Sequence, residues 1–237
     1  MTQQKNNFSF KERRAVVACG SLFYDLNALE GRGGLSGEGV APDLFFLESD
    51  LHRFPLRLPG AIQARIEALG EHYQTIVLGY GLCSNGIVGV GSVKQTLIVP
   101  RVHDCIDLYL GFVGHGRSRI DSGPPCYYLT PGTVLNGKDP LSIMENEYLP
   151  KMGRKNSEWG MGEELKHYPR FALITTDMEE MDRVRARAVE NARFFNMDLE
   201  EIPSDLAFLK KLLSGPYDDD FFLRIPPGKR VQQKMFF

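Results

Sequence analysis

Three cysteines share one local pattern, in which each follows a short apolar run that is typical of a β-strand. These are Cys19, Cys83 and Cys105. Thiolates are soft ligands that suit zinc and iron–sulfur clusters, and three of them complete a tetrahedron with a histidine or an exogenous group. The three cysteines are therefore the candidate metal ligands. The competing interpretation is that each is a small buried apolar residue at a strand end.

The spacing of the cysteines makes this hypothesis depend on the fold. They are separated by 64 and then 22 positions, and the chain has no C-x-x-C pair. In an open parallel α/β sheet, the carboxyl ends of the strands line one edge, and sites are built there. We therefore expect Cys19, Cys83 and Cys105 to meet at this edge.

Other reactive side chains surround Cys105. His103 is a candidate fourth ligand, a proton donor or a turn residue. Asp104 either orients His103, as carboxylates do for metal-bound imidazoles, or caps the helix that follows, and we favour the cap. Arg101 could hold an anionic substrate through its planar guanidinium. Cys126 is a reserve ligand, or a core residue of an edge strand.

A glycine-rich segment follows the predicted strand at residues 75–78. Such loops can cradle phosphate with backbone N–H groups, which makes four positions candidates for cofactor binding. These are Gly79, Gly81, Asn85 and Gly86. The glycines are out of register with G-x-G-x-x-G, and no P-loop lysine follows, so the pattern gives little support for a nucleotide.

The elements that must position these residues alternate between strand and helix. Apolar runs predict strands, and apolar residues at helical spacing with capping signals predict helices. The predicted strands are residues 15–18, 43–48, 75–78, 96–99, 126–130, 171–176 and 198–202. The predicted helices are residues 58–69, 178–196, capped by Asp177, and 206–213, capped by Ser204 and Asp205. Over residues 106–112 the spacing of apolar residues fits both a helix and a strand, and we favour the helix. Residues 139–167 carry only weak helical patterns.

This alternation predicts a Rossmann-like α/β fold, a mostly parallel sheet flanked by helices. We expect a flexible tail over residues 1–12 and a single α/β domain over residues 13–237. A division of this domain into two facing lobes, residues 13–135 and 165–237, is left open.

Composition excludes several classes of protein. The 28 basic and 30 acidic residues nearly cancel, which argues against a nucleic-acid partner. The polar N-terminus lacks the apolar core of a signal peptide, and no apolar stretch is long enough to span a membrane. We therefore predict a cytoplasmic protein without a membrane partner. In that reducing compartment, the four cysteines are expected to be thiols, ligands or buried groups rather than disulfides.

Four motifs resemble an uncharacterised family, catalogued as domain of unknown function 1638. They are Ala-Cys-Gly at 18–20, Gly-Tyr-Gly-Leu-Cys-Ser-Asn-Gly at 79–86, Pro-Arg-Val-His-Asp-Cys-Ile at 100–106 and Tyr-Tyr-Leu-Thr-Pro-Gly at 127–132. The resemblance spans most of the chain. It implies a setting near corrinoid-dependent methyltransferases and one-carbon metabolism, but no established activity. The chain departs from the family at Thr133, where an aromatic residue is usual.

Together, these observations predict a zinc protein in which Cys19, Cys83 and Cys105 bind the metal and leave one position open or filled by His103. A thiol bound there would stay nucleophilic, as methyl transfer to sulfur requires. The resemblance makes a methyltransferase, or an accessory to one, the expected activity, with a thiol or small-molecule substrate and a corrinoid protein as partner. The alternatives are an iron–sulfur cluster on the same cysteines, or a metal-free module that binds a corrinoid protein or an anionic metabolite.

Overall fold

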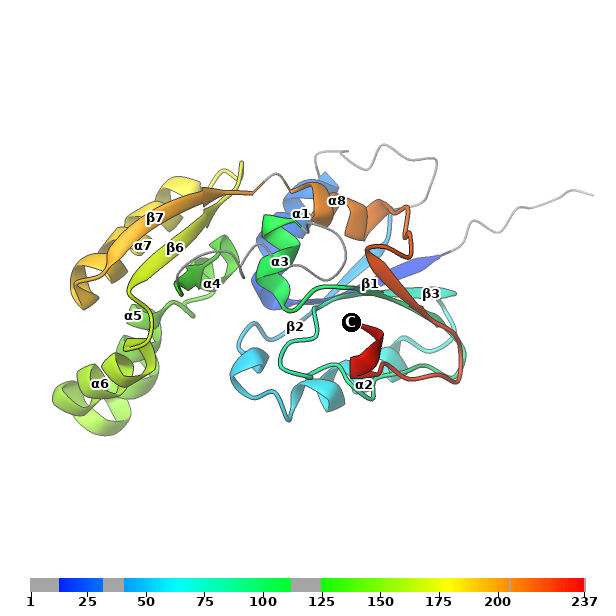
Figure 1. Ribbon diagram of the computed structural model, residues 1–237, viewed down its shortest axis with the longest axis horizontal. Helices are drawn as coiled ribbons and strands as arrows, with labels where there is room; N and C mark the ends of the chain where they lie inside the picture. Colours follow the sequence, from blue (N-terminus) through cyan, green and yellow to red (C-terminus); the bar gives the residue numbers. More distant parts are fainter. Residues whose placement is uncertain (1–12, 32–40, 112–124, 205, 237) are drawn as a thin grey trace, which may run out of the picture.

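The larger of two sheets in this protein is five-stranded and mostly parallel. The computed structural model describes residues 13–31, 41–111, 125–204 and 206–236 (Figure 1), so the predicted tail over residues 1–12 lies outside the described residues. The strand order is β2-β1-β3-β4-β8, and only the β4–β8 pair is antiparallel. The strands are β1 (Arg14–Cys19), β2 (Asp43–Leu47), β3 (Thr75–Gly79), β4 (Thr96–Pro100) and β8 (Phe222–Ile225).

Helices cover both faces of this sheet, as its buried central strands require. On one face, Val17, Ile76 and Leu97 pack against α2 (Leu58–Leu69). On the other face, alternate strand residues pack against three helices. These are α1 (Phe23–Gly31), α3 (Cys105–Leu110) and α8 (Ala207–Ser214). Because successive side chains of a strand point to opposite faces, the near-continuous apolar runs of β1, β3 and β4 supply both cores.

A second, three-stranded parallel sheet forms a smaller lobe beside the first (Figure 1). Its strand order is β5-β6-β7, and its helices pack on one face around Leu129, Phe171 and Leu173. The strands are β5 (Tyr127–Leu129), β6 (Arg170–Thr175) and β7 (Asp198–Pro203). The helices are α4 (Pro131–Leu135), α5 (Pro140–Ile143), the π-helix η4 (Met144–Tyr148), α6 (Leu149–Leu165) and α7 (Met181–Phe195).

The predicted fold class is confirmed: this is an α/β protein with mostly parallel sheets flanked by helices. The two sheets are not built from two consecutive parts of the chain, however. Strand β5 pairs with β6 in the small sheet, although it precedes residue 135, and β8 returns from the C-terminal part of the chain to pair with β4. The two sheets also share packing, because Ile174 of β6 belongs to the same core as α1 and α3.

Two predicted helix starts are wrong. Helix α7 begins at Met181 with Glu180 as its N-cap residue, rather than at Met178 after Asp177. Met178 is buried in the small-lobe core, and its carbonyl oxygen accepts a hydrogen bond from the Met181 N–H in a turn that precedes the helix. Helix α8 has Leu206 at its N-cap position. The Ser204 hydroxyl donates to the Tyr109 carbonyl at 2.6 Å and accepts from the Leu206 N–H at 3.2 Å, and Asp205, the other predicted cap residue, lies outside the described residues.

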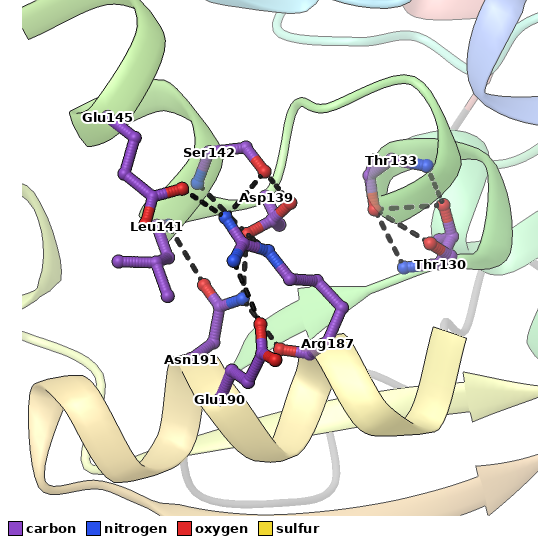
Figure 2. Close-up of polar contacts among 9 residues, drawn as sticks. All are labelled: Thr130, Thr133, Asp139, Leu141, Ser142, Glu145, Arg187, Glu190 and Asn191. Carbon is purple, nitrogen blue, oxygen red and sulfur yellow. Dashed lines mark hydrogen bonds and ion pairs between the residues drawn. The ribbon is translucent and has the colours of Figure 1, made fainter. Parts of the chain in front are cut away.

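A buried polar network joins α5 to α7 (Figure 2). The Asp139 carboxylate, fully buried, accepts hydrogen bonds from the Ser142 N–H at 3.1 Å and the Asn191 amide at 2.7 Å. The Arg187 guanidinium lies 3.3 Å from the same carboxylate. Asn191 in turn accepts from the Leu141 N–H at 2.9 Å. These bonds attach the short helix α5 to the long helix α7.

Candidate functional site: a group of three thiols

The three predicted cysteines lie at the carboxyl ends of three adjacent strands. Cys19 is the last residue of β1, Cys83 follows β3 by four residues, and Cys105 is the first residue of α3, after β4. Strand β3 lies between β1 and β4 in the sheet. Parallel pairing therefore brings the chain to the same edge of the sheet three times.

Cys19 and Cys105 share one neighbour, Ser21. The Ser21 hydroxyl lies 3.1 Å from the Cys19 sulfur and 3.9 Å from the Cys105 sulfur. Each of the two thiols also shifts the pKa of the other. Cys19 and Cys105, 86 positions apart in the chain, thus share one hydroxyl neighbour.

Cys83 joins this pair through backbone contacts. Its N–H donates to the His103 carbonyl oxygen at 2.7 Å, and the backbone at Gly81 and Cys105 acts to lower the pKa of its thiol, although less than burial raises that pKa. The backbones approach closely here: a Cβ atom on Gly81 would lie 2.6 Å from the Asp104 nitrogen. Glycine at position 81 is therefore what lets the loop after β3 reach the start of α3.

The backbone at Cys83 is strained. Cys83, Ser84 and Asn85 have φ values of 48°, 54° and 68°, a run of three non-glycine residues in the left-handed region. Such conformations cost free energy and persist where the surrounding structure enforces them, often at functional sites. The strained turn that contains Cys83 lies at the sheet edge where Cys19 and Cys105 are also found.

The three thiols have different acidities. The hydrogen bond from Cys105 lowers the pKa of Cys19 to about 7, against burial, and Ser21 acts in the same direction. The same hydrogen bond, together with desolvation, raises the pKa of Cys105. Desolvation raises the pKa of Cys83, and the negative charge of Cys19 adds to that effect. In the metal-free protein, Cys19 is therefore partly ionised at neutral pH, while Cys83 and Cys105 stay protonated.

We expect the ultraviolet absorbance of thiolate to report this asymmetry in the metal-free protein. One thiol of the site should ionise as pH rises through about 7, because the lowered pKa of Cys19 places its thiolate form above that pH. Cys105→Ala removes the group that contributes most to the lowered pKa of Cys19, so the midpoint of the thiolate absorbance should move to higher pH. A midpoint that stays at its wild-type value in Cys105→Ala would show that Cys105 does not stabilise the thiolate.

Two buried tyrosines lie beside the thiols. The Tyr109 hydroxyl donates to Asp25 at 2.7 Å and lies 3.0 Å from the Ser21 carbonyl oxygen. The Tyr80 hydroxyl is buried without a hydrogen-bond partner in the described part of the chain. All three cysteines act electrostatically on its phenol group. Sequence reasoning missed Ser21, Tyr80 and Tyr109, since hydroxyl residues next to glycines and apolar residues carry no motif.

The residues predicted near Cys105 take different positions. Asp104 caps α3, and its carboxylate accepts from the Ile106 N–H at 2.8 Å. The backbone of His103 contributes the carbonyl that receives the Cys83 N–H, and the role of its imidazole stays a prediction. Arg101 donates to the Met235 carbonyl at 2.7 Å. It lines a cavity of about 670 Å³ together with Arg224, so its guanidinium is directed to the C-terminal segment.

The glycine-rich loop and Cys126 complete the predicted set. Gly79 ends β3, and the Gly86 N–H donates to the Cys83 carbonyl at 2.9 Å. Asn85 is exposed beside Cys83, and phosphate binding by this loop stays a prediction. Cys126 is buried next to β5 and contributes to the raised pKa of Tyr128. The structure places Cys126 with the small sheet and gives no contact between it and the other three cysteines within the described residues.

A cavity of about 600 Å³ adjoins the thiols. It is lined by Gly20, Ser49, Asp50, Asn136 and Lys138, among others. The Ser49 carbonyl oxygen lies 3.9 Å from the Cys19 sulfur, so one cavity wall touches the site. Asn136, just after α4, donates to the Gly20 carbonyl at 3.0 Å and attaches the small lobe to this wall.

The arrangement as it stands is not a finished coordination site. Across residues 13–31, 41–111, 125–204 and 206–236, no group of three or more histidine, cysteine, aspartate or glutamate side chains is positioned to hold a metal ion. A further finding is that the described helices include none that is both long and apolar enough to cross a membrane.

The fold and the site together define a Rossmann-like α/β protein with three thiols at one sheet edge. Comparison with protein families matches residues 46–213 to a protein of unknown function, DUF1638. That match covers more than half of the 237 residues, and the chain belongs to this family, as its motifs predicted. Cys83 and Cys105 lie within the matched residues, and Cys19 precedes them. No curated protein and no solved structure matches the chain.

Proposed function

We propose that Cys19, Cys83 and Cys105 bind a zinc ion as thiolates, with a fourth position that is open or filled by His103. The observation that carries this proposal is the meeting of three cysteines from three strand ends, two of them sharing the Ser21 hydroxyl. Structural packing alone does not require them to meet. Three thiols in one place are the ligand set that soft metal ions prefer.

Binding requires the three thiols to rearrange, because no group of three such side chains in the described residues is positioned to hold a metal ion. Zinc–sulfur bonds are about 2.3 Å long, so the three sulfurs must surround one point. Cys19 and Cys105 already share the Ser21 hydroxyl as a neighbour. The Cys83 sulfur would have to approach these two sulfurs for all three to bind one ion.

The proposed activity is help in methyl transfer to sulfur. Zinc would lower the pKa of a bound thiol, so that its sulfur stays nucleophilic at neutral pH. In the transfer, a sulfur–carbon bond forms while the methyl group leaves its donor, which retains the electron pair of the broken bond. The donor we propose, a methylated corrinoid protein, comes from the family resemblance alone and is therefore an analogy.

Elemental analysis of the anaerobically purified native protein tests the metal assignment. We expect a colourless protein with one zinc per chain. A brown protein that contains iron and acid-labile sulfide would indicate an iron–sulfur cluster, instead of zinc, on the same cysteines. A protein that contains no metal, even after reconstitution with zinc or with iron and sulfide, would contradict this proposal. It would support the alternative of a metal-free binding module.

A further inference from the structure

A cavity of about 670 Å³ lies along β8, the last strand of the large sheet, and none of the three cysteines of the thiol site lines it. Its size is that of a small-molecule site. The positively charged side chains of its lining are Arg101, Arg224, Lys229 and Arg230. Among the described residues of the lining, Asp219 is the one that carries a negative charge. The cavity is therefore positively charged, in a chain whose net charge is -2.

The four cations of this cavity are not neutralised by carboxylates of the protein. Within the described part of the chain, none of them forms an ion pair. Lys138 provides a contrast, because its ammonium group lies 3.0 Å from the Asp50 carboxylate and 2.9 Å from that of Glu147. A cleft lined by charges of one sign raises the local concentration of ions of the opposite sign. The cavity is therefore suited to an anionic ligand.

Arg101 has a hydrogen-bond donor left for such a ligand. Its backbone N–H donates to the Phe221 carbonyl at 2.8 Å, and its guanidinium donates through Nη1 to the Met235 carbonyl at 2.7 Å. Its Nε atom is buried and has no hydrogen-bond partner among the described residues. A buried donor without an acceptor costs free energy. An anion in the cavity would supply the missing acceptor.

Backbone hydrogen bonds fix one wall of the cavity in place. The Gly228 N–H donates to the Ser92 carbonyl at 2.8 Å, and the Val231 N–H donates to the Val90 carbonyl at 2.8 Å. The two cations at positions 229 and 230 lie between these anchored residues. Because the wall is already ordered, a ligand does not have to pay for ordering it, and this favours binding.

We propose that this cavity binds a small phosphate monoester, with the phosphate group among the four cations. A phosphate group carries about two negative charges near neutral pH and has three oxygens that accept hydrogen bonds, so it can contact several cations at once. A carboxylate has one charge and two oxygens. Phe222, Leu223 and Ile225 also line the cavity, and their apolar side chains give the organic part of an ester a surface to pack against.

Isothermal titration calorimetry of the full-length protein tests this inference. The probes are phenyl phosphate and benzoate, which share an aromatic ring and differ in the anionic group. We expect wild-type protein to bind phenyl phosphate at least about tenfold more tightly than benzoate. Arg224→Met removes a cation from an exposed position and should raise the dissociation constant for phenyl phosphate about tenfold, the usual effect of losing a hydrogen bond to a charged group. Arg101→Lys retains the charge but lacks the Nε donor, so it should also weaken binding.

Lys234→Met is the matched control, because Lys234 is an exposed cation of the same C-terminal segment that does not line the cavity. It should leave the affinity for phenyl phosphate unchanged. Equal losses in Lys234→Met and Arg224→Met would show that general surface charge attracts the anion, and would overturn the inference. Wild-type protein that binds neither probe, or that binds benzoate as tightly as phenyl phosphate, would overturn it as well. The measurement does not involve the metal, so its result is independent of the zinc proposal.

Discussion

Replacing Cys19, Cys83 or Cys105 singly with serine is expected to lower zinc affinity by more than about 100-fold. Loss of an outer-shell partner already costs about 10- to 100-fold in metal affinity, and loss of a direct ligand should cost more. Serine retains the size of the side chain but replaces a soft thiolate with a hydroxyl that stays protonated at neutral pH. Competition with a chromophoric chelator measures the affinity of each variant.

Cys126→Ser is the matched control for these three variants. Cys126 is also buried, but it lies beside the small sheet, where it contributes to the raised pKa of Tyr128. We expect this variant to bind zinc as wild type does. Far-ultraviolet circular dichroism of all four proteins separates loss of the site from loss of the fold. Retention of full affinity in Cys83→Ser would reduce the site to Cys19 and Cys105, and loss of affinity in Cys126→Ser would contradict the placement of the metal.

The position of the thiols could be predicted from the sequence because it depends on a simple feature of topology. An apolar run that ends in cysteine places that cysteine at a strand end, and parallel strands bring their carboxyl ends to one edge. The contacts that tune the site could not be predicted. Ser21 reaches both sulfurs because Gly20–Leu22 turns directly after β1, and Tyr80 is buried by packing between distant elements.

The fold was predictable where apolar periodicity is strong, as in β3, α2 and β6. It was not predictable over residues 139–167, which form α5, η4 and α6 in succession. Most side chains of α6 are solvent-exposed, and only Ser157, Met161 and Leu165 are buried, so the segment lacks a full apolar stripe. Gly153, with a φ of 72°, interrupts the helical geometry further.

Strand β8 was also not predicted, because it is only four residues long. It pairs antiparallel with β4, which is distant in the sequence. The structure gives Thr133 a structural role in the first turn of α4. Its hydroxyl accepts from the Thr130 N–H at 2.9 Å, and the Thr130 hydroxyl accepts from the Thr133 N–H at 3.1 Å. This reciprocal pair is a capping box at the start of α4, a role that an aromatic residue could not fill.

Arg187→Met is expected to destabilise the protein by about 1.5–3 kcal/mol, the usual cost of losing a hydrogen bond to a charged group, because the Arg187 side chain is itself 22% exposed. Methionine retains the apolar stem of Arg187 but leaves the fully buried Asp139 carboxylate without its cation (Figure 2). Chemical denaturation of the metal-free protein measures the change in the free energy of unfolding. Glu190→Gln is the matched control, since Glu190 is an exposed partner of the same guanidinium and should cost less than about 1 kcal/mol.

A double variant separates the buried charge from general packing. If the uncompensated carboxylate causes the loss, Asp139→Asn combined with Arg187→Met should be more stable than Arg187→Met alone, because neither charge then remains. Simple additivity of the two losses would show that Arg187 stabilises α7 through its packing instead. The network adjoins the segment that carries Asn136, which donates to the Gly20 carbonyl beside the thiols. Loss of stability in the small lobe should therefore loosen the cavity wall next to Cys19, while the three ligands themselves stay in place.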